Sequence, residues 1–430
     1  MPHSIALELA RQVGSGLASA EHTVRRYVEA VAAGDGAVQA FAAFDPAVAI
    51  ESAQVVDRLP VKGPLAGVPV AVKDIIDTAQ YATCYGSPIY RGHRPLLDAA
   101  CVALLRRAGA VVLGKTVTAE LATFAPGPTR NPHAPGHTPG GSSSGSAAAV
   151  AAGMAPLALG TQTAGSVIRP ASFCGVIGYK PSARRVPRSG VRVNSDTLDE
   201  VGLFASSVDD AALLASVLAL QPDWVALPAQ GRGGPAPQIG WTLTSRGERL
   251  EPAMRQAVER AAERARAAGA RGRPLAWPAP FDRLFDAQLT IQLAETARAL
   301  APEYAYRRSQ LSAQLIEAIE QGQRFTQEHY ADALLTARFC AASVDSLFGD
   351  AEVIIAPSAV GEPPATLAST GDPLFNRPWQ LLGCPVIGLP FGTGEQGLPI
   401  GVSVIARPGR DAQLIAAAAW LEQCWRRGPN

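Results

Sequence analysis

The sequence is organised around one run of small residues, Gly140-Gly-Ser-Ser-Ser-Gly-Ser-Ala-Ala-Ala-Val-Ala-Ala-Gly153, which continues directly into Met154-Ala-Pro-Leu-Ala-Leu-Gly-Thr-Gln-Thr-Ala-Gly-Ser166. The order of residue types predicts a glycine- and serine-rich loop, an alanine-rich helix, an apolar strand and a second small-residue loop that ends in Ser166. Glycine permits tight turns and close backbone approach, and the serines supply hydroxyl groups. We expect these loops to form one wall of an active site on a rigid scaffold, with a base supplied from elsewhere in the chain.

The composition indicates a folded protein without a broad attraction to polyanions. Hydrophobic residues make up 47% of the 430 residues and charged residues 17%, which is typical of a globular chain. The formal net charge of +1 argues against nucleic acid or an anionic membrane as a partner. No apolar run approaches the ~18 residues that cross a bilayer, and the first residues do not form a signal peptide. We therefore expect a soluble, cytoplasmic protein.

The spacing of the cysteines is also consistent with a cytoplasmic protein. They are scattered, without a C-x-x-C pair and without metal-ligand spacing, so we expect reduced thiols and no metal site. The six cysteines lie at positions 84, 101, 174, 340, 384 and 424.

Alternating strand and helix patterns predict an α/β fold. We expect one α/β/α domain with a central mixed, mostly parallel sheet that helices cover. Residues 1–59 are predicted as N-terminal helices that pack on a catalytic domain of residues 60–430. Within that domain, the mainly helical segment 222–350 is expected to cover one side of the site. Further buried strands are predicted at 110–114, 353–357, 386–390 and 400–406, and helices at 98–108, 207–220, 252–268, 281–301, 304–320, 326–348 and 411–425.

The β-branched run Gly67-Val-Pro-Val-Ala-Val-Lys-Asp-Ile-Ile-Asp77 predicts a buried strand that carries Lys73. Burial disfavours the charged amine and lowers its pKa, and a neutral lysine can act as a general base. The alternative is that Lys73 lies at the strand end and pairs with Asp74 or Asp77.

The serine loop does not fit a histidine-based triad. Gly141-Ser-Ser-Ser-Gly145 formally matches G-x-S-x-G, the nucleophile elbow of α/β-hydrolases. That elbow follows a strand, whereas a loop rich in proline and glycine precedes it here, and His329 is the only histidine downstream. The loop also lacks the lysine of a phosphate-binding P-loop.

These motifs resemble the amidase signature family of serine amidohydrolases. The resemblance rests on Gly140–Gly153 together with Gly160–Gly175, and it covers about residues 60–425. Shorter matching stretches are Pro69–Asp74, Gly178–Pro181, Leu198–Gly202, Gly383–Val386 and Gly397–Gly401.

The resemblance implies a Ser–Ser–Lys triad that needs no cofactor. Lys73 is the expected base, Ser142 the bridging serine after a cis peptide bond, and Ser166 the nucleophile that forms an acyl-enzyme. The expected reaction is cleavage of a C–N bond in a small-molecule amide, half-amide, carbamate or urea. The oxyanion would be bound by the backbone N–H groups of Thr163, Ala164, Gly165 and Ser166.

The sequence departs from the common family pattern inside the second motif. Gln162 stands where aspartate is usual, Ala164 where glycine is usual, and Ile168 where arginine is usual, with Arg169 directly after it. This variant is similar to the malonamidase-type branch, in which the shifted arginine is associated with a substrate carboxylate. We hypothesise that Arg169 anchors an acidic or carbonyl group; the alternative is a structural ion pair behind the loop.

Other parts of the site and of the function stay open at this point. Tyr85, Phe124 and Trp379 are candidate pocket walls, although core packing suits each equally well. The alternative functions are the glutaminase subunit of a tRNA-dependent amidotransferase, an esterase or urethanase on the same site, and an inactive binding protein. The resemblance is also compatible with a homodimer.

Overall fold

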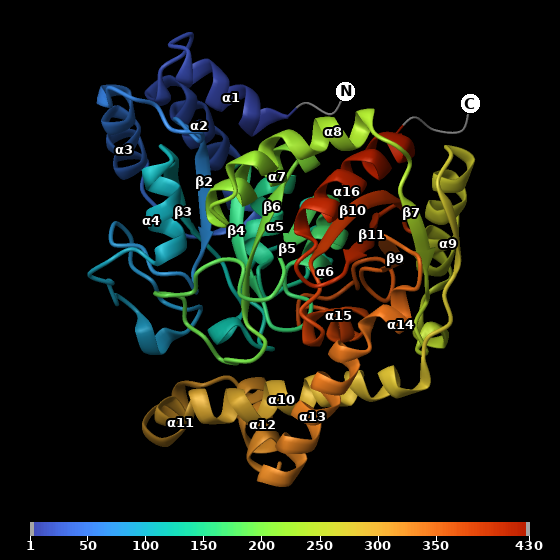
Figure 1. Cartoon of the computed structure of the whole chain (residues 1–430). Coiled ribbons are helices and arrows are strands. Elements are labelled where there is room, and N and C mark those ends of the chain that lie inside the picture. The colour runs from blue at the N-terminus through green and yellow to red at the C-terminus, as the bar shows by residue number, and fades with distance from the viewer. Residues whose placement is uncertain (1–3, 427–430) are drawn as a thin grey trace.

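All strands of the described residues, 4–426 of this computed structural model, join one sheet of eleven strands. Helices cover both faces of this sheet (Figure 1). The order across the sheet is β1-β3-β2-β4-β6-β5-β10-β11-β9-β7-β8. The strands are β1 (Phe41–Phe44), β2 (Pro69–Lys73), β3 (Val111–Thr116), β4 (Leu157–Gln162), β5 (Ile177–Lys180), β6 (Glu200–Ala205), β7 (Gln238–Trp241), β8 (Arg271–Pro274), β9 (Val353–Pro357), β10 (Val386–Thr393) and β11 (Pro399–Ala406).

The sheet is mixed, which confirms the predicted α/β class, but parallel pairs are not the majority. Four strand pairs are parallel and six are antiparallel. One reason is the short turn at 394–398 between β10 and β11, because a short connection can join only antiparallel neighbours.

Most helices fall where the sequence has amphipathic or alanine-rich runs, but the short helices at 168–174, 227–233 and 377–381 were not predicted. The predicted helix 304–320 is divided between α11 and α12, and the predicted helix 326–348 is divided between α13 and α14. The helices are α1 (Ile5–Gly14), α2 (Ala20–Val38), α3 (Pro46–Arg58), α4 (Ala100–Arg107), α5 (Ser144–Ala151), α6 (Ile168–Cys174), α7 (Val208–Leu218), α8 (Leu227–Gly233), α9 (Pro252–Ala267), α10 (Arg283–Ala299), α11 (Ala301–Arg307), α12 (Ala313–Gln323), α13 (Gln327–Ala342), α14 (Val344–Phe348), α15 (Arg377–Leu381) and α16 (Asp411–Arg426).

The sheet separates two hydrophobic cores. On β9, Val353 and Ile355 face the core that includes α1, α4, α7, α9 and α16. Ile354 and Ala356 face the core that includes α2, α3, α5 and α6. Because both faces are buried, the central strands consist of nearly continuous apolar residues instead of alternating with polar ones.

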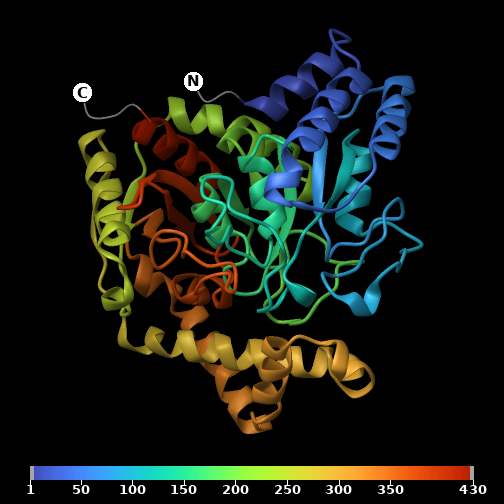
Figure 2. The ribbon, with the colours of Figure 1, turned by 180° about the vertical axis from the view of Figure 1, so that it is seen from behind.

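Helices α10 to α13 form a helical arm (residues 283–342) that lies below the sheet in both views (Figures 1 and 2). A small cluster of Ala287, Ile291 and Ala333 joins the arm to Leu198 of the body. The arm belongs to the segment 222–350, which also supplies β7 and β8 to the sheet, while the first 59 residues supply β1.

The topology brings two loops to one edge of the sheet. Strands β2 and β4 run parallel and end at Lys73 and Gln162. Strand β6 is antiparallel to β4 and begins at Glu200, opposite Gln162. The loop after β4 (residues 163–167) and the loop before β6 (residues 194–199) therefore meet beside Lys73, at the strand ends where α/β folds commonly bind ligands.

The close packing of α5 against the sheet predicts a large effect of one added methyl group. A Cβ on Gly145 would lie 2.2 Å from the Ala40 carbonyl oxygen and 2.5 Å from the Val117 nitrogen, and backbone atoms cannot move aside cheaply. We expect Gly145→Ala to lower the free energy of unfolding by ~1–3 kcal/mol, measured by urea denaturation. Gly136→Ala is the control, because no atom lies within 4 Å of its added Cβ. Equal stability of the two variants would contradict this packing.

Candidate active site

Lys73 is fully buried at the end of β2 and has two hydroxyl partners. Its Nζ donates to Ser142 Oγ at 2.8 Å and to Thr161 Oγ1 at 2.8 Å. Burial lowers the pKa of Lys73 to about 7, against the opposing effect of the negative charge on Asp199. A substantial fraction of this amine is therefore neutral near pH 7, as a general base requires.

The neighbouring aspartates do not pair with Lys73. Asp74 forms a buried ion pair with Lys115, with Nζ to Oδ1 at 2.9 Å. Asp77 instead accepts a hydrogen bond from the Tyr85 hydroxyl at 2.9 Å. No ion pair within residues 4–426 includes Lys73, so its closest polar contacts are hydroxyl groups and not carboxylates.

Ser142 stands in the loop that leads into α5. The Gly141–Ser142 peptide bond is cis, as the family resemblance implies. The loop is fastened to the second motif, because Ser143 Oγ donates to the Thr161 carbonyl at 3.1 Å. Its backbone is also fastened to the neighbouring segment, where Ala119 N–H donates to the Ser142 carbonyl at 3.1 Å.

Gln162 shapes the loop that carries Ser166. Its Oε1 accepts the backbone N–H groups of Val167 at 2.9 Å and Ile168 at 3.1 Å, at the start of α6. Its Nε2 donates to Gln380 Oε1 at 3.0 Å. The glutamine thus supplies the acceptor that an aspartate could supply, and it adds a donor that ties the loop to α15.

The loop closed by Gln162 leaves several donors without partners. Among the described residues, the backbone N–H groups of Ala164, Gly165 and Ser166 form no hydrogen bond. The hydroxyl of Ser166 also forms no hydrogen bond with any described residue. Ser166 is 9% exposed. The structure therefore joins Lys73 directly to Ser142, whereas Ser166 lies on the neighbouring loop without a hydrogen bond to Ser142.

Thr163 begins this loop and is held at two atoms. Its Oγ1 donates to Asp199 Oδ1 at 2.5 Å, and its carbonyl accepts from Gln288 Nε2 of α10 at 3.0 Å. Burial raises the pKa of Asp199, while the hydrogen bonds from Thr163 and two backbone N–H groups and the charge of Lys73 lower it.

Sequence reasoning assigned no role to several of these residues. Asp199 lies in the quoted stretch Leu198–Gly202 and Thr161 lies in Gly160–Gly175, so their motifs were visible. Gln288 comes from a helix without any motif, and only the tertiary structure identifies it.

Arg169 is buried, and its guanidinium binds the backbone of the loop that carries Ser142. Its Nε donates to the Thr370 carbonyl at 2.7 Å, and its Nη2 donates to the Gly141 carbonyl at 2.6 Å. Its Nη1 is buried without a hydrogen-bond partner, and a Cβ on Gly165 would lie 3.2 Å from this atom. Burial lowers the pKa of Arg169 to about 10, so the guanidinium stays charged at neutral pH.

The three candidate pocket walls differ in burial and in the residues that they contact. Tyr85 is buried, its hydroxyl bonds Asp77, and its ring meets Tyr90 edge-on with centroids 5.0 Å apart. Trp379 is buried edge-on against Trp277 at 5.5 Å, as a core residue would be. Phe124 is half-buried. The roles of Tyr85 and Phe124 in substrate binding stay predictions.

The described residues hold no cluster of three or more histidine, cysteine, aspartate or glutamate side chains suited to a metal ion. Within the same residues, every helix is too short or too polar to cross a bilayer. Cys84, Cys101, Cys174, Cys340 and Cys384 are free thiols.

Comparison with known sequences gives a match over most of the chain. The profile of the family described as Amidase matches residues 22–415. A glutamyl-tRNA(Gln) amidotransferase subunit of Koribacter versatilis is 31% identical over 94% of this chain and 95% of its own length. The corresponding subunit of Thermus thermophilus is 32% identical over 98% of each chain.

Solved structures resemble this one over nearly their whole length. The peptide amidase of Stenotrophomonas maltophilia is 29% identical, with a TM-score of 0.85 over 98% of this chain and 96% of its own. A 6-aminohexanoate cyclic dimer hydrolase complexed with substrate is 27% identical, with a TM-score of 0.87 over the same shares. A structure described as a vestigial complex that reveals the origins of an s-triazine catabolic enzyme is 31% identical, with a TM-score of 0.89 over 97% of this chain and 98% of its own.

Proposed function

Since the chain belongs to the amidase family and is an amidohydrolase acting on carbon–nitrogen bonds, we propose that it cleaves a small-molecule amide-type bond through an acyl-enzyme on Ser166. The observation that carries this proposal is the buried amine of Lys73. It lies 2.8 Å from the hydroxyl of Ser142 and beside the loop of Ser166.

The proposed proton path begins at Lys73. The charged amine donates to both Ser142 and Thr161; in the neutral amine, the lone pair takes the place of the N–H at Ser142, while an N–H still donates to Thr161. Lys73 then accepts the proton of Ser142, and Ser142 accepts the proton of Ser166. Hydrogen bonds of this kind are often long or absent without substrate, so we expect the bond between the two serines to form when the substrate binds.

The bond changes follow from this path. The Ser166 oxygen forms a bond to the carbonyl carbon, and the π electrons move to the carbonyl oxygen. Collapse of this intermediate breaks the C–N bond, and the leaving nitrogen takes the proton that Ser142 and Lys73 return. Water then gives a proton to Ser142 and Lys73 and attacks the acyl carbon; the bond from this carbon to the Ser166 oxygen breaks, Ser166 regains the proton, and the acid leaves. The unpartnered N–H groups of Ala164, Gly165 and Ser166 are the proposed oxyanion donors, together with that of Thr163; one such donor contributes ~2.7–4 kcal/mol.

A second candidate function is glutamine hydrolysis within an amidotransferase assembly. Full-length similarity to the glutamyl-tRNA(Gln) amidotransferase subunits of the two bacteria favours it. Two features weigh against it: the unusual Gln162 and Arg169 in the second motif, and a net charge of +1, which offers no basic excess for tRNA. We place the protein in the cytoplasm, which the scattered spacing of its cysteines supports; a homodimer stays a prediction.

Arg169 is proposed to bind an anionic or carbonyl group of the substrate. Its unpartnered Nη1 lies beside the loop of Ser166, and no carboxylate within the described part of the chain forms an ion pair with it. The charge of Asp372 favours the charged form of Arg169 more than the charge of Arg377 opposes it. A bound carboxylate would satisfy the unpartnered Nη1.

The direct test of the function is a panel of amides, half-amides, carbamates, ureas, esters and free glutamine. We expect the wild-type enzyme to release ammonia or an amine from at least one amide-type substrate. Ser166→Ala should lower kcat by ~10⁴-fold or more, because the nucleophile is lost. Turnover that survives in Ser166→Ala would contradict the acyl-enzyme. Activity on glutamine alone would favour the second candidate.

The pH dependence tests the base. We expect log kcat/KM to rise with pH and to level off above about pH 7, because only neutral Lys73 accepts a proton and burial sets its pKa there. Lys73→Ala should remove this rise and lower the rate by ~10²–10⁴-fold. Asp199→Asn should move the rise to lower pH, since the Asp199 charge raises the pKa of Lys73.

The control for the base is Lys62→Ala, because Lys62 is half-buried and bonds only the backbone carbonyls of Val56 and Asp57. Its profile should match that of the wild type. A Lys73→Ala enzyme that keeps the wild-type profile would refute the base.

The Arg169 proposal predicts a difference between two substrates. For an amide that carries a carboxylate, Arg169→Ala should raise KM by ~10-fold or more beyond its effect on the uncharged analogue, because a charge-assisted hydrogen bond is lost. The variant also loses the hydrogen bond from Nη2 to the serine loop. This loss affects both substrates, so it cancels when their changes in KM are compared. Equal changes in both KM values would leave Arg169 a purely structural role.

A further inference from the structure

The helical arm reaches the loop of Ser166 by two routes that both start on α10. Gln288 of α10 donates directly to the Thr163 carbonyl at 3.0 Å. The second route runs from Glu295 of α10 through the loop of residues 194–199 to the Thr163 hydroxyl. Thr163 is thus held on both its backbone and its side chain.

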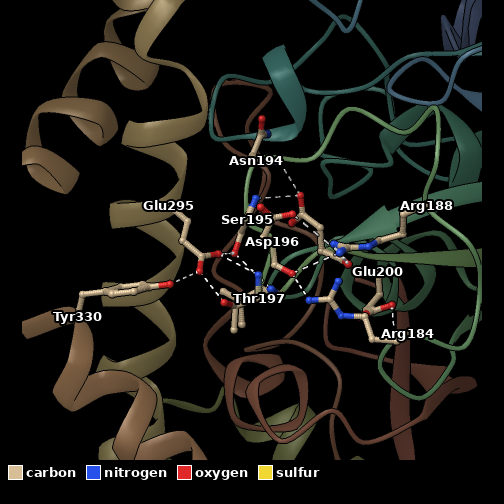
Figure 3. Close-up of polar contacts among 11 residues, drawn as sticks. Arg184, Arg188, Asn194, Ser195, Asp196, Thr197, Glu200, Glu295 and Tyr330 are labelled. Atoms are coloured by element: carbon tan, nitrogen blue, oxygen red, sulfur yellow. Dashed lines mark hydrogen bonds and ion pairs between the residues drawn. The ribbon is translucent and has the colours of Figure 1, made fainter. Parts of the chain in front are cut away.

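Glu295 is the buried end of the second route, with its side chain bonded by four donors. Ser195 Oγ, Thr197 N–H at 3.0 Å and Thr197 Oγ1 at 2.5 Å donate from the 194–199 loop. Tyr330 of α13 donates from the other side at 2.6 Å. Figure 3 shows this carboxylate between Tyr330 and the two loop residues. Removing it would leave these donors without their acceptor, which is costly inside a protein.

The same loop builds the cradle of the Asp199 carboxylate. Backbone N–H groups of Asn194 and Ser195 donate to Asp199 Oδ2 at 2.8 and 3.1 Å. The other oxygen, Oδ1, accepts the Thr163 hydroxyl. Ser195 therefore joins Glu295 through its side chain to Asp199 through its backbone.

The body of the protein holds the 194–199 loop at several points. The Asn194 side chain donates to the Leu121 carbonyl, and Asp196 forms an ion pair with Arg188 at 4.0 Å. Further contacts are made by carbonyl groups of the loop. Arg184 donates to the Asp196 carbonyl, and Arg188 donates to the Asp199 carbonyl at 2.8 Å (Figure 3). These arginine contacts lie on the side of the loop away from Glu295. None of these contacts with the body involves the hydroxyl groups of Ser195 and Thr197, which both donate to Glu295 of the arm.

We propose that Glu295 is a positioning residue of the hydrolase reaction: through Ser195 and Asp199 it fixes Thr163, and thereby the N–H groups that follow Thr163 in the oxyanion loop. This inference rests on the proposed function. It makes the arm part of the catalytic geometry in addition to its place beside the site. Because oxyanion donors act only on the charge of the transition state, loss of Glu295 should slow the chemical step more than it weakens binding.

A fluorophosphonate probe measures that step without knowledge of the natural substrate. The serine oxygen forms a bond to phosphorus and displaces fluoride, its proton passing toward Lys73, and the developing phosphoryl oxygen charge needs the same N–H donors. Mass spectrometry of the labelled peptides identifies the modified serine. The concentration dependence of labelling separates the maximal rate constant from the half-saturating probe concentration.

We expect Glu295→Ala to lower the maximal labelling rate constant by ~10-fold or more with less than a threefold change in half-saturation, since small misplacements of catalytic groups carry costs of this size. Glu295→Gln should restore part of the rate, because the amide keeps one acceptor and the hydroxyls can rotate. Thr197→Val removes one donor and should give a smaller loss in the same direction, even if Glu295→Ala does not fold.

The matched control is Glu303→Gln on α11. Glu303 is also buried on the arm and also ties it to the body, through Tyr90 and Arg192, but it does not contact the 194–199 loop. We expect wild-type labelling in this variant. An equal loss in Glu303→Gln, or a wild-type rate in both Glu295→Ala and Thr197→Val, would overturn the positioning role and leave the proposed function intact. Failure of the wild-type enzyme to become labelled at Ser166 would overturn both.

Discussion

The candidate site depends on Lys73, a buried amine whose Nζ contacts the hydroxyl groups of Ser142 and Thr161. Lys73 ends a strand whose two faces are covered, and burial lowers its pKa to about 7. Lys115 on the adjacent strand β3 is equally buried, but it has Asp74 at 2.9 Å. Burial lowers the pKa of both lysines, yet only Lys115 gains a direct ionic partner that favours its charged form. The ion pair indicates a structural role for Lys115, whereas proton transfer is the role that we propose for Lys73.

Small residues and amides build the surroundings of this amine. Ser142 and Thr161 give Lys73 hydroxyl partners. A hydroxyl can donate or accept a hydrogen bond, so these partners suit both the charged and the neutral amine. Gln162 collects two backbone N–H groups at the start of α6, so the preceding N–H groups stay free for a ligand. The site therefore has acceptors that bind its own backbone, and it has unpaired N–H donors at the proposed oxyanion position.

Local sequence predicted the residues whose role follows from their own segment. The apolar run around Lys73 predicted its burial, and the two small-residue motifs predicted the loops of Ser142 and Ser166. The strand β8, an exposed Arg-Gly-Arg-Pro segment, carried no apolar pattern and was missed. Asp199, Gln288 and Glu295 act through segments far apart in the chain, and no periodicity or spacing reports such contacts. Their contributions are visible only when the arm and the two loops are seen together.

The account is tested most directly by the ionisation of Lys73 itself. The chain has four lysines, at positions 62, 73, 115 and 180, so selective ¹³C labelling of lysine Cε gives an NMR spectrum with few signals, and the Lys73→Arg variant identifies the one of interest. We predict that this signal titrates near pH 7 in the folded protein, as burial of the amine requires. A Lys73 signal that stays protonated until the ~10.4 of an exposed lysine would contradict the neutral base on which the mechanism is built.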